Sequence, residues 1–119
     1  MQATFVAVLL VVVIIGAGCH RAPTPEAGAR ALLDKWTAAV MAGESGAQFW
    51  SDPGQVEKPY AVRSVKILSV TVQPNDPRAA DIVARVESSN KAGIRITSDW
   101  RFFLKDRGDG WKIEIMLTQ

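Results

Sequence analysis

The apolar residues of this chain change their spacing once, near residue 60, and this change constrains the fold more than any other feature. Before it, Ala29, Leu33, Trp36 and Val40 recur every three or four residues, as on one face of an amphipathic helix. After it, apolar and polar residues alternate, which is typical of antiparallel strands with one buried and one solvated face. This order predicts an α+β fold in which one long N-terminal helix packs on a sheet.

The expected helix has signals at both ends. It begins at the Thr-Pro-Glu sequence of residues 24–26, because Thr is a favoured N-cap, Pro suits the first helical position and an acid stabilises the first turn. Gly43 is expected to end it, since glycine readily adopts the backbone conformation that follows a helix. A short helical turn over residues 45–50 would then place Phe49 and Trp50 on the core.

Four strands are expected after the helix, at residues 61–73, 81–89, 93–105 and 110–117. The connections NKAG and DRGDG are of hairpin length and contain Gly, Asn and Asp, which turns favour. The residues expected on the inward face of the last three strands are Ile82, Ala84 and Val86, then Ile94, Ile96, Trp100, Phe102 and Leu104, and finally Trp111, Ile113, Ile115 and Leu117.

The first strand does not keep a single alternation. Val65 and Ile67 have one parity, whereas Leu68, Val70 and Val72 have the other. A β-bulge near Ile67 and Leu68 would bring both sets to one face and would bend the sheet. The predicted sheet is therefore a curved, four-stranded antiparallel meander.

The order of the elements, with the DGWKI sequence of residues 109–113 opening the last strand, resembles the cystatin-like and nuclear-transport-factor-2-like superfamily. Several bacterial lipoproteins of unknown function are similar in this respect. The resemblance implies a cavity between helix and sheet, which larger members close with three helices and in which the enzymes place an Asp, His or Tyr. In this chain the second helix is short and no third is expected.

The only cysteine, Cys19, follows an uncharged and mostly apolar run from Ala3 to Gly18. This run is shorter than the roughly 20 residues that a helix needs to cross a bilayer, and it suits the apolar region of a signal peptide. The IGAGC sequence of residues 15–19 resembles the lipobox of bacterial lipoprotein precursors, with Gly16 where a lipobox usually has Leu. The resemblance implies cleavage before Cys19 and its acylation with chains such as palmitate. The alternatives are an uncleaved anchor helix and a secreted product with a free thiol.

The expected organisation is a lipoprotein signal peptide (residues 1–18), a lipidated cysteine with a short tether (19–25) and one α+β domain (26–119). Two or three acyl chains would hold the domain on a membrane, whereas one chain binds only marginally. The tether HRAPTP spans at most ~20 Å, so the domain would work close to the membrane surface. The resemblance places it in a bacterial cell envelope, outside the cytoplasm. If the envelope is Gram-negative, His20 favours the outer membrane, because an Asp at this position retains some Gram-negative lipoproteins in the inner membrane.

Composition excludes several classes of function. A single cysteine permits no intramolecular disulfide, two-cysteine redox site or multi-cysteine zinc site. The 14 Lys and Arg residues are spread singly among 12 Asp and Glu residues, so no basic stripe for nucleic acid is expected. The only histidine, His20, lies outside the domain, and the polar residues with inward parity are Ser88 and Ser98, which lack a base. We therefore expect no cofactor, no metal and a non-enzymatic module.

Two sites remain as hypotheses. On the outward face, Asp81, Asp99 and Glu114 are expected to form cross-strand pairs with basic residues, and Phe103 has the same outward parity. This face is the expected surface for a protein or cell-wall partner, and its residues are Arg85, Arg95, Arg101, Phe103 and Lys112. The alternative is a small-molecule binder or minor enzyme, with a cavity lined by Trp36, Tyr60, Trp100 and Trp111. For the tryptophans, simple core packing is the competing interpretation.

Overall fold

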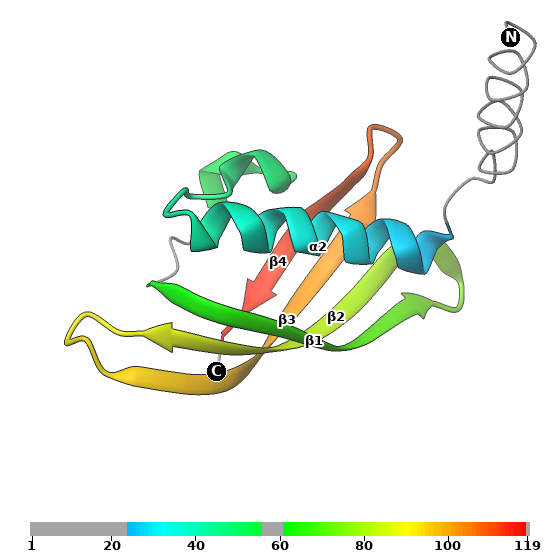
Figure 1. Ribbon diagram of the computed structural model, residues 1–119. Coiled ribbons are helices and arrows are strands. Elements are labelled where there is room, and N and C mark those ends of the chain that lie inside the picture. The colour runs from blue at the N-terminus through cyan, green and yellow to red at the C-terminus, as the bar shows by residue number, and fades with distance from the viewer. Residues whose placement is uncertain (1–23, 56–60, 119) are drawn as a thin grey trace, which may run out of the picture.

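The computed structural model describes residues 24–55 and 61–118, and it confirms the expected α+β fold (Figure 1). The four strands form one antiparallel sheet in the order β1-β2-β3-β4, with the long helix α2 lying across one face. The predicted signal peptide, Cys19, His20 and Tyr60 lie outside the described residues. The elements are α2 (Pro25–Met41), η1 (Ala47–Phe49), η2 (Pro53–Gln55), β1 (Val62–Gln73), β2 (Asp76–Ser89), β3 (Arg95–Asp106) and β4 (Trp111–Leu117).

Both ends of α2 form as the sequence predicts. The Thr24 hydroxyl accepts a hydrogen bond from the Ala27 amide at 3.1 Å and so satisfies one of the unpaired donors of the first turn. At the other end, the Glu44 amide donates to the Ala39 carbonyl at 3.0 Å, and Gly43 has a φ of 88°. This is a Schellman ending, in which a glycine in the left-handed region turns the chain away from the helix.

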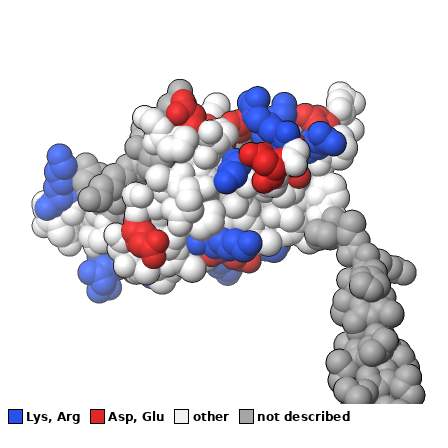
Figure 2. All heavy atoms as spheres, turned by 90° about the horizontal axis from the view of Figure 1, so that it is seen from above, with Lys and Arg blue, Asp and Glu red and all other residues white. Residues whose placement is uncertain are grey.

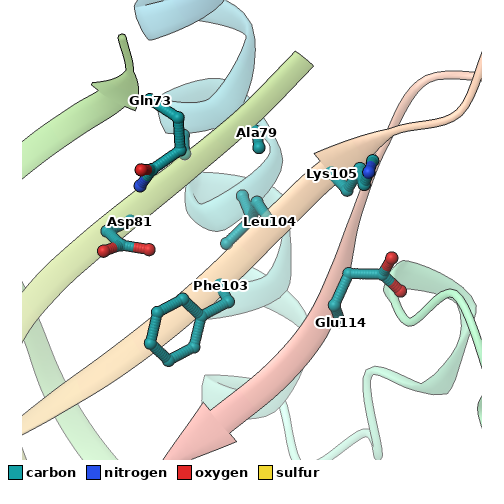
Figure 3. A pocket seen from close by; sticks show the side chains of 8 residues that line it. Gln73, Ala79, Asp81, Phe103, Leu104, Lys105 and Glu114 are labelled. Carbon is teal, nitrogen blue, oxygen red and sulfur yellow. The ribbon is translucent and has the colours of Figure 1, made fainter. Parts of the chain in front are cut away.

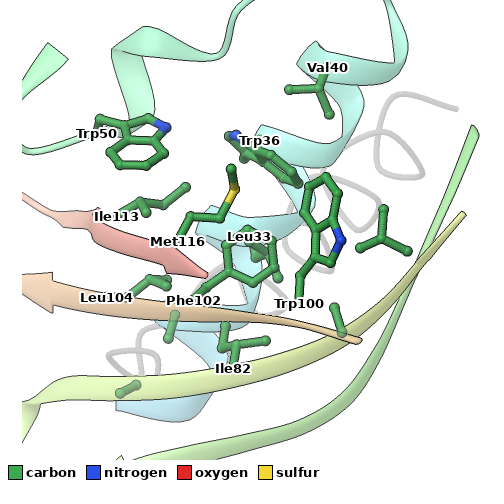
Figure 4. Packing of buried hydrophobic residues seen from close by; sticks show 14 of the residues in the cluster. Leu33, Trp36, Val40, Trp50, Ile82, Trp100, Phe102, Leu104, Ile113 and Met116 are labelled. Carbon is green, nitrogen blue, oxygen red and sulfur yellow. The ribbon is translucent and has the colours of Figure 1, made fainter. Parts of the chain in front are cut away.

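The core lies between α2 and the sheet. Leu33 and Trp36 of α2 are fully buried against Ile82 and Phe102 of the two central strands. The Trp36 and Phe102 rings meet edge to face with 5.1 Å between their centroids (Figure 4), an arrangement that aromatic pairs prefer. The space below the helix is therefore filled by packed side chains.

The described strands shift register at four places, and two of these bulges bear on the predicted faces of the sheet. The first was expected: Ile67 pairs with Ala84 and Ser69 with Val83, so Leu68 is the extra residue of β1. The second was not expected and lies at Glu114 of β4, because Leu104 pairs with Ile113 and Phe103 with Ile115.

The bulge at Glu114 corrects the inward set of the last strand. Beyond it the parity reverses, so that Met116 is buried, at 6% exposure, while Ile115 and Leu117 are 50% and 47% exposed. The prediction that Ile115 and Leu117 face inward was wrong, because a one-residue slip moves every later side chain to the opposite face.

Two further expectations are corrected at the ends of the strands. β2 begins at Asp76 rather than 81, and Pro77 sits in the irregular pairing at its start, where a missing amide donor is tolerated. Ile94 and Ile96, expected in the core, are 60% and 43% exposed. The strands carry them beyond the end of α2, which leaves them without cover from the helix (Figure 1).

Candidate functional site

In the described part of the chain, α2 and η1 lie on one side of the sheet, and the opposite face, here called the open face, carries no element (Figure 1). The outward residues of β2, β3 and β4 form it. A four-stranded sheet with one wet face is ordinary for antiparallel pairing. Whether such a face can bind a partner depends on which apolar and charged side chains it exposes.

An apolar strip runs along the β3–β4 side of the open face. Phe103 pairs with Ile115, and Leu117 pairs with Arg101. The guanidinium carbon of Arg101 lies 5.6 Å from the centre of the Phe103 ring, within the range of a cation–π contact. We call Phe103, Ile115 and Leu117 the open-face strip. Phe103 is half-buried, whereas the two aliphatic side chains are about half exposed.

Ion pairs border the strip on the β2 side. Arg85 Nε lies 3.1 Å from Asp99 Oδ1, and an Arg101 nitrogen lies 3.7 Å from Asp81 Oδ2. The expected cross-strand pairing of Asp81 and Asp99 is thereby confirmed. Exposed pairs of this kind contribute little to stability. Here each pair neutralises its own arginine beside the strip. An apolar partner that binds there therefore does not have to bury an unpaired positive charge from Arg85 or Arg101.

Glu114 does not join this set. Its carboxylate accepts hydrogen bonds from the Ser51 hydroxyl and from Arg107, whose Nε lies 3.0 Å away. The Ser51 hydrogen bond, and to a lesser degree Arg107, hold the pKa of Glu114 below its ordinary value against the raising effect of burial. A carboxylate with a lowered pKa is a weak proton acceptor. Glu114 therefore ties the segment after η1 to β4 rather than serving as a catalytic base.

A shallow hollow of about 350 Å³ adjoins the strip (Figure 3). Phe103 forms part of its lining, and polar side chains surround it. Because the hollow is open and lined partly by an aromatic ring, it can receive one side chain of a binding partner. The polar residues that line it are Gln73, Asp81, Lys105 and Glu114.

The structure divides the surface that the sequence predicted. Arg85, Arg101 and Phe103 lie together on the open face. Arg95 lies at the far end of β3, beyond the strip. The Lys112 side chain reaches η1, where its Nζ donates a hydrogen bond to the Gln48 carbonyl at 3.0 Å. Ile115 and Leu117 were missed as surface residues, because simple alternation assigns them to the core.

The alternative cavity is not assembled from the tryptophans. Trp36 is fully buried, and Trp100 is buried with its Nε1 donating to Ser98 Oγ at 3.1 Å. Trp111 is only partly buried, lies over Gly28 and contributes to the lining of two surface hollows. Core packing therefore accounts for Trp36 and Trp100, and Trp111 stands apart from them.

Comparison with known proteins adds no relative: no protein-family model, no curated protein and no solved structure matches this chain. Among residues 24–55 and 61–118, no helix is both long enough and apolar enough to span a membrane. Within the same residues, no group of three or more His, Cys, Asp or Glu side chains could hold a metal ion. The open face and the sequence before the domain are therefore the two features of this chain that bear on its function.

Proposed function

We propose that this chain is a lipid-anchored, non-enzymatic module of a bacterial cell envelope that binds a protein partner through the open face of its sheet. The observation that carries the proposal is the open-face strip, where the apolar residues Phe103, Ile115 and Leu117 lie on neighbouring strands whose open face no described element covers. The anchor part of the proposal is supported by the lipobox-like sequence that ends at Cys19.

The chemistry of the strip favours a protein over a cell-wall glycan. Aliphatic side chains such as Ile115 and Leu117 gain most from burial against other apolar side chains, at about 25 cal/mol per Å². An aromatic residue at the centre of such a surface, bordered by polar groups that exclude water, is the usual arrangement of an energetic hot spot. The partner surface is expected to carry one protruding apolar side chain for the hollow beside Phe103.

The experiment is co-purification from the envelope of the source cell with the full chain as bait. Ile115→Asp and Phe103→Asp are expected to abolish capture of the partner, since each places a charge on the apolar contact. Met41→Asp is the matched control, because Met41 is 50% exposed at the end of α2, away from the open face. Unfolding curves identify any variant that has lost its fold. Capture that survives both open-face substitutions in folded protein would refute the proposal.

A further inference from the structure

Strands β1, β2 and β3 continue well past the end of β4. β4 pairs with β3 only from Arg101 onward, whereas β2 and β3 remain paired as far as Ser89 and Arg95. This extension also passes the end of α2 (Figure 1). Ile94 and Ile96 lie on it, and Ile94 is the most exposed large apolar side chain among the described residues.

The turn at the end of the extension has a defined conformation. The Asn90 side-chain oxygen accepts hydrogen bonds from the Ala92 amide at 2.9 Å and the Ile94 amide at 3.0 Å. The Asn90 amide donates to the Ile94 carbonyl at 3.0 Å, and Gly93 has a φ of 80°. An Asx-type turn closed in this way fixes the backbone that presents Lys91 and Ile94.

The charge of this region is one-sided. Residues 61–73 and 86–98 contain four basic residues and one acid, Glu87. Arg63 Nε donates to Ser89 Oγ at 3.1 Å, which places its guanidinium beside the turn. Figure 2 shows basic side chains at this end of the molecule and mixed signs over the rest of that face. We call Arg63, Lys91, Ile94, Arg95 and Ile96 the arm tip.

We propose that the arm tip docks on a bilayer that contains anionic phospholipid. Ile94 and Ile96 would enter the boundary between headgroups and acyl chains, while Lys91, Arg95 and Arg63 contact the lipid phosphates. Apolar side chains flanked by cations bind anionic membrane surfaces by these two effects together. A protruding hairpin with two aliphatic side chains suits insertion between lipids, whereas a stable protein interface needs a larger and flatter apolar area.

This inference rests on the described residues and does not depend on acylation of Cys19 or on a partner at the open face. The arm tip and the start of α2 lie at opposite ends of the molecule (Figure 1). If the anchor precedes α2, the domain therefore touches the membrane at both ends.

The test uses the full chain with ¹³C-labelled isoleucine methyl groups, mixed with nanodiscs that carry doxyl-labelled lipid. One set of nanodiscs is phosphatidylcholine alone, and the other also contains phosphatidylglycerol. The methyl signals of Ile94 and Ile96 are expected to broaden with phosphatidylglycerol, while those of buried Ile82 and exposed Ile115 keep their width. The double variant Lys91→Glu, Arg95→Glu is expected to lose the broadening, and the control Arg30→Glu, Lys35→Glu, with two exposed helix cations reversed, is expected to retain it.

Each outcome decides the proposal. Absence of broadening at both tip methyls, or equal broadening with and without phosphatidylglycerol, overturns it. Broadening of Ile115 in place of Ile94 overturns it as well, since the open face would then contact lipid. Unchanged chemical shifts of the Ile82 and Ile113 methyl groups establish that a variant is folded. Ile94→Ser is a second variant, which removes an apolar side chain and leaves the charges in place. Loss of partner capture with intact tip broadening would count only against the proposed function.

Discussion

The indole of Trp111 lies so close over Gly28 that a β-carbon on this glycine would sit 2.6 Å from the indole nitrogen. Gly28 is inside α2, where glycine costs up to about 1 kcal/mol relative to alanine. The contact explains why a poor helix former occupies the position: the start of α2 and the start of β4 approach each other here, and only a hydrogen fits between them.

Gly28→Ala should therefore destabilise the domain despite its better helix propensity. Displacing the Trp111 ring is expected to cost about 1–3 kcal/mol, which exceeds the gain in propensity. Urea unfolding gives the difference in free energy. In a Trp111→Leu background the same substitution is expected to become stabilising, because the clash is gone. If Gly28→Ala destabilises both backgrounds equally, the contact with Trp111 is not the cause.

The Glu114 carboxylate should make stability depend on acid pH. Because the Ser51 and Arg107 hydrogen bonds hold its folded-state pKa below the ordinary 4.5, its contribution is fully present above that unfolded value. It is lost as the pH falls through the lower folded pKa. Urea unfolding from neutral pH to about pH 3 should show this loss in the parent chain and a smaller one in Glu114→Gln. Arg107→Gln removes one hydrogen-bond partner of Glu114. Its loss of unfolding free energy with falling pH should lie between those of the parent chain and Glu114→Gln.

The bulge at Glu114 is tested by a pair of adjacent substitutions. Met116→Asp places a charge in the core and is expected to cost at least ~3 kcal/mol. Leu117→Asp, on a side chain that is 47% exposed, should change stability by less than about 1 kcal/mol. If the strand alternated without a bulge after Ile113, Leu117→Asp would instead be the more destabilising of the two substitutions. Thermal unfolding of both variants distinguishes the two registers.

That pair also shows what the sequence could and could not establish. The start of α2 was predictable because Thr24 and Pro25 act locally, and its end because Gly43 does. The bulge at Leu68 was predictable because two apolar parities collide within one strand. Nothing comparable marks Glu114: Ile115, Met116 and Leu117 are all apolar, so only the register of β4 against β3 decides which of them is buried.

The residues of the candidate site were likewise predictable only where a local sequence pattern determines their position. Phe103 and the cross-strand pairs followed from strand parity, which is a local property. The exposure of Ile115 and Leu117 depends on the bulge at Glu114, which no sequence pattern indicates. The exposure of Ile94 and Ile96 depends on where α2 ends relative to the strands. Parity assigns a side chain to a face of the sheet, but whether another element covers that face is a property of the whole fold.

The anchor is tested by Cys19→Ala, expressed as the full chain in a bacterial host that processes lipoproteins. The parent chain should sediment with membranes, and its mass should correspond to cleavage before Cys19 with added acyl chains. Cys19→Ala should retain residues 1–18 and carry no acyl mass, since the thiol is the expected site of acylation and cleavage of the peptide bond before residue 19 is expected to require the acylated cysteine. His20→Ala, the neighbouring control, should be processed like the parent. An unacylated parent chain that is cleaved elsewhere would refute the lipid anchor and favour a secreted product. An unacylated parent chain that keeps residues 1–18 would refute it as well and would favour an uncleaved anchor helix.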